Sequence, residues 1–158
     1  IFLIIILVFK IKFYQTSLTF IFIFLIFMLP NIDYFKYNKI SILDDVWQDF
    51  DKIEISTLIN DNKLVFLDIT ADWCITCQFN KINVINSKKI SNILNDKNIV
   101  LVRADWTKPN SRIDSFLKKY NKFGIPFNAI FSQKYPEGII MSEILTQKEI
   151  IKNLEIAK

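Results

Sequence analysis

The chain of 158 residues has no histidine and only two cysteines and two methionines. A structural zinc site needs four ligands, so the two cysteines could hold zinc only together with carboxylates or a second chain. Copper carriers use sulfur or imidazole ligands, whereas Met28 and Met141 are distant in sequence from the cysteines. We therefore expect no metal and no bound cofactor, and a metal-binding module is the least favoured function.

A large surplus of positive charge is also missing. The formal net charge is +4, and Lys10 and Lys12 supply two of these charges beside an apolar segment. The other 18 basic residues (20 less these two) are nearly balanced by 16 acidic residues. This balance lacks the excess of basic residues that is typical of nucleic-acid-binding proteins, so we expect no nucleic-acid partner.

Long hydrophobic runs, in contrast, open the chain. Residues 1–9 are apolar, and a second run over residues 13–29 has about 17 residues, the short end of what spans a bilayer core. Lys10 and Lys12 lie between the runs, so the positive-inside rule predicts a cytoplasmic link and a second segment that leaves the membrane outward. The chain begins with isoleucine and not methionine, which suggests that an N-terminal part is missing. An uncleaved signal-like anchor is the alternative for residues 13–29.

Composition divides the chain into three parts. We predict one or more transmembrane segments over residues 1–29, a linker over residues 30–45 and one folded domain over residues 46–158. The linker mixes polar and aromatic residues without clean periodicity. Under either interpretation of residues 13–29, we expect the folded domain to be tethered on the outer, extracytoplasmic side of the membrane.

Strands and helices alternate along the folded domain. Apolar runs between turn residues predict strands over residues 64–70, 99–104, 127–131 and 139–141. Helices are predicted from an Asp51/Glu54 N-cap pair to about Ile59, from Cys74 to about Ile85, from Ser87 to Leu94, from Asn110 or Ser111 to about Tyr120, and from the capping box Thr146-Gln147-Lys148-Glu149 onward. This order is typical of an α/β sandwich.

The strand over residues 64–70 leads into the sequence Trp-Cys-Ile-Thr-Cys, and a helical pattern starts at the first cysteine. Unpaired backbone N–H groups at a helix N-terminus favour the reactive thiolate of Cys74. Cys77 lies one helical turn further on the same side, within reach of a disulfide with Cys74. A static disulfide of this spacing would constrain the unfolded chain little. The spacing therefore favours redox exchange, in which Cys74 attacks and Cys77 resolves.

These residues resemble a known family. The run Phe66-Leu67-Asp68-Ile69-Thr70-Ala71-Asp72-Trp73-Cys74-Ile75-Thr76-Cys77 looks like the active-site strand and helix of thioredoxin-like domains. Its Ala-Asp-Trp-Cys form is similar to the C-terminal domain of DsbD-type thiol:disulfide interchange proteins. Three further stretches agree: Val46-Trp47-Gln48-Asp49-Phe50, Arg103-Ala104-Asp105-Trp106-Thr107 and Gly124-Ile125-Pro126. The resemblance implies a thioredoxin-like three-layer α/β/α sandwich preceded by a transmembrane helix.

The resemblance also assigns roles to four further residues. Asp68 lies on an otherwise apolar strand, where burying a carboxylate costs free energy unless it is protonated or has a partner. In the family, the acid at this position handles the proton of the resolving thiol. Pro126 is expected to follow a cis peptide bond and to face the cysteines, and Ile125 to pair with substrate backbone. Trp73 is expected to shape the substrate surface beside Cys74. Three of these roles have a purely structural alternative. Asp68 could be a strand-end carboxylate bonded to backbone or water, Pro126 a loop proline that starts a strand, and Trp73 an ordinary packing residue.

Two positions depart from the family pattern. Relatives commonly carry lysine directly after the second cysteine and an acid three residues later, where this chain has Gln78 and Lys81. Loss of the acid removes a group that disfavours thiolates, and Lys81 would favour them if it turned toward the site. The family's redox potential is therefore not transferred to this chain.

The expected function is that of a membrane-tethered protein-disulfide reductase in the bacterial inner membrane, with its thioredoxin-like domain on the periplasmic side. Its expected partners are oxidised extracytoplasmic proteins as substrates and a membrane electron-transfer domain, with its own cysteine pair, as reductant. Cytochrome c maturation is one process that it could serve. The alternative with the same chemistry is a stand-alone, membrane-anchored thioredoxin that reduces apocytochrome c.

Overall fold

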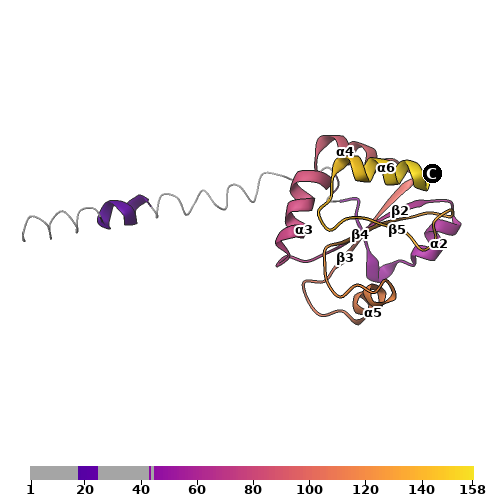
Figure 1. Ribbon diagram of the computed structural model, residues 1–158, viewed down its shortest axis with the longest axis horizontal. Helices are drawn as coiled ribbons and strands as arrows, with labels where there is room; N and C mark the ends of the chain where they lie inside the picture. Colours follow the sequence, from indigo (N-terminus) through magenta and orange to yellow (C-terminus); the bar gives the residue numbers. More distant parts are fainter. Residues whose placement is uncertain (1–17, 25–42, 44) are drawn as a thin grey trace, which may run out of the picture. The chain divides into compact units, whose positions relative to one another are not determined.

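The computed structural model describes residues 18–24, residue 43 and residues 45–158 (Figure 1). The chain divides into two compact units, Ile1–Ile40 and Ser41–Lys158, and each is described by itself.

In the first unit, residues 18–24 are helical and their large apolar side chains are exposed. Within the described ranges, no helix is both long and apolar enough to cross a membrane. Most of the predicted membrane segment (1–29) and most of the predicted linker (30–45) lie outside the described residues, so both stay predictions.

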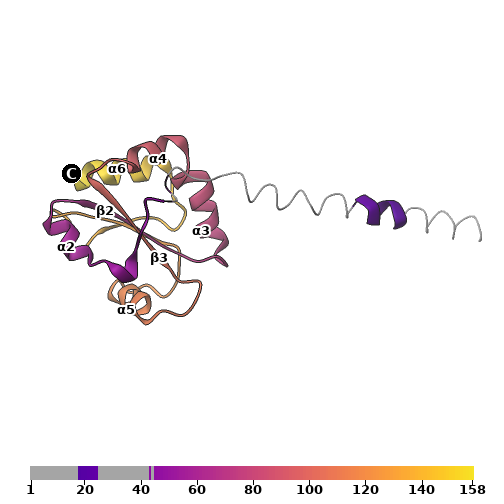
Figure 2. The same cartoon turned by 180° about the vertical axis from the view of Figure 1, so that it is seen from behind.

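The second unit is built around one five-stranded sheet with the order β1-β3-β2-β4-β5 (Figures 1 and 2). The central strand β2 runs parallel to β3 and antiparallel to β4, and β5 closes the far edge antiparallel to β4. The predicted strands are confirmed within one residue at their ends, and a short first strand is added. Their bounds are β1 (Gln48–Asp49), β2 (Leu64–Thr70), β3 (Ile99–Asp105), β4 (Phe127–Phe131) and β5 (Ile139–Ile140).

Helices cover both faces of this sheet, which gives the predicted α/β/α layers (Figures 1 and 2). One layer buries side chains of η2, α4 and α6 against Phe66 and Leu101, and Cys77 of α3 packs in a separate small cluster with Ala71 and Cys74. The other layer buries side chains of η1, α2 and α5 against Leu67 and Ile69. The bounds are η1 (Phe50–Lys52), α2 (Ile55–Asn60), α3 (Ile75–Asn80), η2 (Lys81–Ile85), α4 (Lys88–Leu94), α5 (Ser111–Lys119) and α6 (Gln147–Ala157).

Alternation along β2 decides which side chain meets which helix layer. Successive side chains of a strand point to opposite faces. Leu67 and Ile69 therefore point toward α2 and α5, whereas Phe66 and Asp68 point toward the layer of α3. The one acidic side chain of β2 thus enters the layer whose helix carries the cysteines.

Three predicted helix starts are confirmed by side-chain caps. Ser87 accepts a hydrogen bond at the start of α4, Asn110 accepts two at the start of α5, and Thr146 accepts the backbone N–H of Glu149 at the start of α6. The capping box is only half formed, because the Glu149 carboxylate accepts from the backbone N–H and the hydroxyl of Ser142 instead. Local polar patterns therefore located these helix starts correctly.

The helix start predicted at Asp51 is wrong. Asp51 lies inside η1, a short 3-10 turn, and α2 begins only at Ile55. The reason is a tertiary contact: Arg112 of α5 donates to the carbonyl oxygens of Asp51 and Ile53 and to the carboxylate of Glu54 over 2.7–2.8 Å. These carbonyls are therefore satisfied from outside, and the backbone at Ile53 stays extended.

Candidate active site

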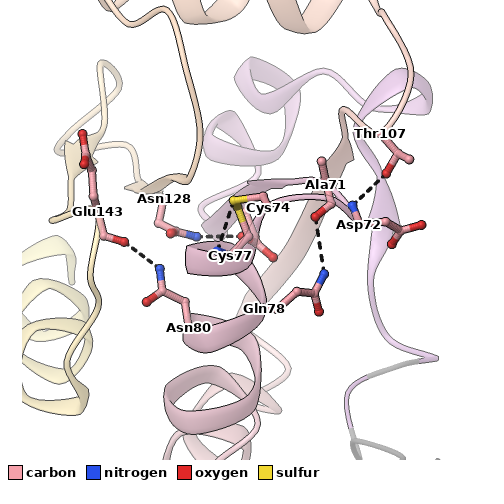
Figure 3. The surroundings of a disulfide bond; sticks show 10 residues. Ala71, Asp72, Cys74, Cys77, Gln78, Asn80, Thr107, Asn128 and Glu143 are labelled. Carbon is pink, nitrogen blue, oxygen red and sulfur yellow. Dashed lines mark hydrogen bonds between the residues drawn. A yellow bond between two sulfur atoms is a disulfide. The ribbon is translucent and has the colours of Figure 1, made fainter. Parts of the chain in front are cut away.

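Cys74 and Cys77 form a disulfide where β2 leads into α3 (Figure 3). Cys74 is the N-cap of α3, and its Sγ accepts a hydrogen bond from the backbone N–H of Cys77 over 3.1 Å. The helix predicted from Cys74 to Ile85 is confirmed in extent, but it changes from α-helical to π-helical geometry at Lys81. Both cysteines are mostly buried, so the disulfide is part of the packed end of the helix.

The turn before the disulfide is held by the carbonyl oxygen of Ala71. The backbone N–H of Cys74 donates to this oxygen over 3.1 Å, and the side-chain amide of Gln78 donates to it over 3.4 Å (Figure 3). Gln78 is one of the two positions that depart from the expected family pattern. In this chain that position supports the active-site turn by a neutral hydrogen bond.

Asp68 is buried at 5% exposure in the middle of the sheet. It is paired in register with Arg103 of β3 on one side and with Asn128 of β4 on the other. Arg103 Nε lies 3.5 Å from one carboxylate oxygen, and the Asn128 amide donates to the other over 2.9 Å. Both carboxylate oxygens of Asp68 thus have side-chain partners, while its role in proton transfer stays a prediction.

Arg103 is held by an aromatic ring as well as by the carboxylate. Its guanidinium carbon lies 4.0 Å from the ring centroid of Trp47, within the range of a cation–π contact. Trp47 in turn meets Phe66 edge to face, with 6.1 Å between ring centroids. The positive charge beside Asp68 is therefore fixed by packing in the same helix layer.

Opposing effects set the proton affinity of Asp68. Burial raises the pKa of this carboxyl above the ordinary value of 3.8. The charge of Arg103, the hydrogen bond from Asn128 and, more weakly, the charge of Lys81 lower the same pKa without cancelling the effect of burial. Asp68 consequently binds a proton more readily than a surface aspartate does.

The loop after β3 supports the active-site turn through Thr107. Its hydroxyl accepts from the backbone N–H of Asp72 over 3.0 Å (Figure 3). The same hydroxyl donates to the carboxylate of Asp105. Its carbonyl oxygen accepts from the indole N–H of Trp73 over 3.4 Å. Trp73 is 60% exposed, and its ring lies 6.3 Å from that of Trp106. Trp106 also packs, partly buried, against the apolar cluster that contains Leu67 and Ile69. A substrate-binding role for Trp73 stays a prediction.

The Ile125–Pro126 peptide bond is cis, as predicted. Ile125 is half-buried and packs against the small cluster formed by Ala71, Cys74 and Cys77. Residues about 50 positions after the cysteines are thus brought into contact with them. Backbone pairing of Ile125 with a substrate stays a prediction.

Sequence reasoning did not assign roles to four residues that the fold places around the site. Arg103 and Asn128 contact Asp68, Thr107 holds the turn, and the buried Asn80 ties α3 to the loop before α6 by bonds to Glu143 O and Leu145 N (Figure 3). For Arg103 and Asn128 the available signal was a polar residue on a mostly apolar strand, whereas Thr107 lies in a loop and gave no such signal. Within residues 18–24, 43 and 45–158, no group of three or more His, Cys, Asp or Glu side chains is placed to hold a metal ion.

The fold and the disulfide define the class of this domain. A family model described as thioredoxin-like matches residues 55–132. The reduced C-terminal domain of DsbD from Neisseria meningitidis superposes with a TM-score of 0.54 at 19% identity, covering 70% of this chain and 100% of that chain. A thioredoxin from Thermus thermophilus also gives a TM-score of 0.54, at 15% identity, covering 70% of this chain and 84% of that chain. The folded unit is therefore a thioredoxin-like domain with a CxxC disulfide.

The curated relatives narrow this class. The thiol:disulfide interchange protein DsbD of Yersinia pestis is 33% identical over 72 residues, which are 46% of this chain and 12% of that protein. DsbD of Campylobacter jejuni is 24% identical over 125 residues, which are 79% of this chain and 21% of that protein. The domain resembles the C-terminal domain of DsbD, and the chain is a distant homologue of DsbD proteins that spans only a small part of their length.

Proposed function

We propose that this chain is a membrane-tethered protein-disulfide reductase that passes electrons to disulfides of extracytoplasmic proteins. The observation that carries this proposal is the Cys74–Cys77 disulfide at the start of α3, in a domain related to DsbD. The apolar composition of residues 1–29 supports the tether, and the relationship to DsbD supports a place on the periplasmic side of the inner membrane.

The first step uses the reduced cysteine pair. The thiolate of Cys74 attacks one sulfur of the substrate disulfide, a Cys74–substrate mixed disulfide forms, and the other substrate sulfur leaves as a thiolate. Cys74 is the residue for this step because it stands at the N-terminal edge of α3, where backbone N–H groups stabilise negative charge.

The second step releases the substrate. The thiol of Cys77 gives its proton to the Asp68 carboxylate, the resulting thiolate attacks Cys74 Sγ, and the second substrate sulfur leaves as a thiolate. The substrate gains two electrons, and the Cys74–Cys77 pair is oxidised. Two features of Asp68 support its role: it points into the layer of α3, and its pKa is raised by burial.

The surface around the disulfide suits a protein substrate. Trp73 and Ile75, the two neighbours of Cys74 in the chain, expose 60% and 86% of their surface. Large exposed apolar side chains beside a reactive group are typical of protein-binding surfaces. Ile125, before the cis-proline, would pair its backbone with an extended substrate segment.

The oxidised pair must then receive two electrons. We propose that a membrane electron-transfer domain with its own cysteine pair supplies them by the same exchange chemistry. The DsbD relatives extend far beyond the region matched here, which is consistent with such a domain in the natural system. Cytochrome c maturation is one process that this relay could serve.

The test is the equilibrium reduction potential of the full chain. The chain would be equilibrated in thiol–disulfide buffers and the reduced fraction read from the mass shift after alkylation. We expect a value near or below about −200 mV, on the reducing side of strong oxidants such as DsbA. A strongly oxidising value, or no disulfide at any buffer potential, would contradict the reductase function.

A trapping experiment adds a matched control. Cys77→Ser keeps the attacking thiol but removes the resolving thiol, so we expect the mixed disulfide with an oxidised protein substrate to accumulate. Cys74→Ser should form no such adduct, since Cys77 lies inside the helix. Equal adduct formation by both variants would contradict the assigned order of attack.

A further inference from the structure

Asn128 is a buried polar residue in the middle of an apolar strand. It is 1% exposed, and the other four residues of β4 are Phe127, Ala129, Ile130 and Phe131. Among the described residues, its side chain donates to Asp68 Oδ1 over 2.9 Å, while its own Oδ1 is buried without a hydrogen-bond partner. An apolar residue would avoid the cost of that unpaired oxygen. The one interaction gained in return is the bond to Asp68.

Backbone register makes this contact specific. Asp68 and Asn128 are directly opposite each other in the antiparallel pair of β2 and β4, and side chains in such pairs are about 5 Å apart at Cβ. Arg103 is opposite Asp68 on the other side. The carboxylate is thus bracketed across three strands, with one oxygen directed to a cation and the other to a neutral N–H donor.

We propose that Asn128 is a positioning residue that holds the Asp68 carboxylate beneath the active-site helix and favours its ionised, proton-accepting form. This inference rests on the proposed function, because the proton to be accepted is that of the Cys77 thiol. A donated N–H bond stabilises the carboxylate more than the neutral acid, which opposes the effect of burial on the pKa of Asp68.

Other charged groups act on the same carboxyl. Arg103 faces it from β3, and Lys81 acts on it from η2. In the oxidised protein Cys74 and Cys77 do not titrate, because both are in the disulfide. The titration of Asp68 in the oxidised chain therefore reports on Arg103, Lys81, Asn128 and burial, without a contribution from the thiols.

The first experiment measures the titration of Asp68 directly. The oxidised full chain would be labelled with 13C at aspartate carboxyls, and the Asp68 signal identified by its absence in Asp68→Asn. In Asn128→Leu, which keeps the branched shape with a larger volume and has no donor, we expect the titration midpoint to rise by about one pH unit, the order expected for loss of a hydrogen bond to a charged group. Asn128→Val, also without a donor, should give the same direction if the leucine variant folds poorly.

Asn80→Leu is the matched control. Asn80 is also buried, but it bonds to backbone groups of Glu143 and Leu145 and not to a titrating side chain. The Asn80→Leu variant should be less stable than wild type, but the titration midpoint of Asp68 should not change. An unchanged midpoint in both Asn128 variants, or an equal shift in Asn80→Leu, would overturn the proposal.

The second experiment separates this proposal from the proposed function. The rate at which Cys77 resolves a Cys74 mixed disulfide would be measured against pH in the wild-type and Asn128→Leu chains. We expect the rate profile to move to higher pH together with the Asp68 midpoint. A moved midpoint with an unmoved rate profile would support the contact between Asn128 and Asp68 and overturn the proton-accepting role of Asp68.

Discussion

The two faces of the central strand β2 meet different surroundings. On one face, Leu67 and Ile69 are fully buried in an apolar cluster with side chains of α2 and α5. On the other face, Asp68 interrupts an apolar layer and is bracketed by Arg103 and Asn128. Residues adjacent in sequence therefore have different surroundings. Leu67 and Ile69 contribute apolar packing, whereas the partners of Asp68 adjust the proton affinity of its carboxylate.

Aromatic contacts show the same difference between the faces. On the face of α5, Phe116 meets the rings of Phe50, Phe127 and Phe131 edge to face, at 5.3–6.3 Å between centroids. On the face of α3, the ring of Trp47 lies against the guanidinium of Arg103. Both faces place a cation against a ring, because the Arg112 guanidinium lies 4.9 Å from the ring centroid of Phe50. Arg103, however, pairs with the buried Asp68, whereas Arg112 pairs with the exposed Glu54.

The largest expected effect concerns the disulfide itself. Cys74→Ser should abolish reduction of a protein disulfide, because serine supplies no thiolate for the first attack. Loss of activity with an unchanged urea midpoint, compared with the reduced wild type, would assign the effect to chemistry. Residual reduction above that of the buffer would contradict the role of Cys74.

Asp68→Asn should slow the resolving step by about 10²-fold near neutral pH, the lower end of what general acid–base catalysis contributes. The amide keeps an oxygen for the bond from Asn128 but cannot accept the thiol proton. Rapid-quench alkylation of the mixed disulfide measures this step. An unchanged rate would place the proton acceptor elsewhere.

The same variant should alter stability in a pH-dependent manner. Because burial raises the pKa of Asp68, the folded state binds its proton more tightly than the unfolded state. The stabilisation from that proton is complete below the unfolded pKa and is lost as the pH rises through the folded pKa. Relative to wild type, Asp68→Asn should therefore gain stability with rising pH above about 4. Urea unfolding of the oxidised wild-type and Asp68→Asn chains at several pH values measures this effect. A difference in the free energy of unfolding that does not change with pH would contradict the prediction.

On the packing face, Leu117→Ala should lower the free energy of unfolding by about 3 kcal/mol, since Leu117 is fully buried in the cluster with Leu67. The reduction potential should stay within experimental error of wild type. Urea unfolding and redox equilibration of the same preparations test both statements. A clear shift in potential would show that the two faces are coupled.

The smallest expected effect is at Thr107. Thr107→Val loses the hydroxyl that accepts from Asp72 N, which should cost about 1 kcal/mol of stability and alter the fluorescence of Trp73. Thr107→Ser keeps the hydroxyl and should behave as wild type. If both variants behave alike, the hydroxyl does not hold the active-site turn.

Much of the fold was predictable because its signals are local. The apolar run before Trp-Cys-x-x-Cys predicted β2 and α3, and the caps at Ser87, Asn110 and Thr146 predicted three helix starts. Each of these depends on residues within one helical turn or one strand. The failure at Asp51 has the opposite cause, since its carbonyl oxygen is bound by Arg112, 61 residues later.

Part of the candidate site was predictable in the same way. Cys74 and Cys77 form a local pair whose spacing already allows a disulfide, and Asp68 was conspicuous as a carboxylate on an apolar strand. The cis bond before Pro126 was expected from family resemblance, whereas the general frequency of cis X-Pro bonds is only about 5%. Local spacing thus identified the disulfide pair but not everything that surrounds it.

By itself, the sequence determined the disulfide pair, the strand and helix that carry it, and the need of Asp68 for partners. Only the tertiary structure decided that the partners are Arg103 and Asn128, 35 and 60 residues further along the chain. The physical reason is strand register: which residues stand opposite Asp68 depends on how β3 and β4 align with β2. That alignment is set by burial of whole strand faces and not by any residue near the cysteines.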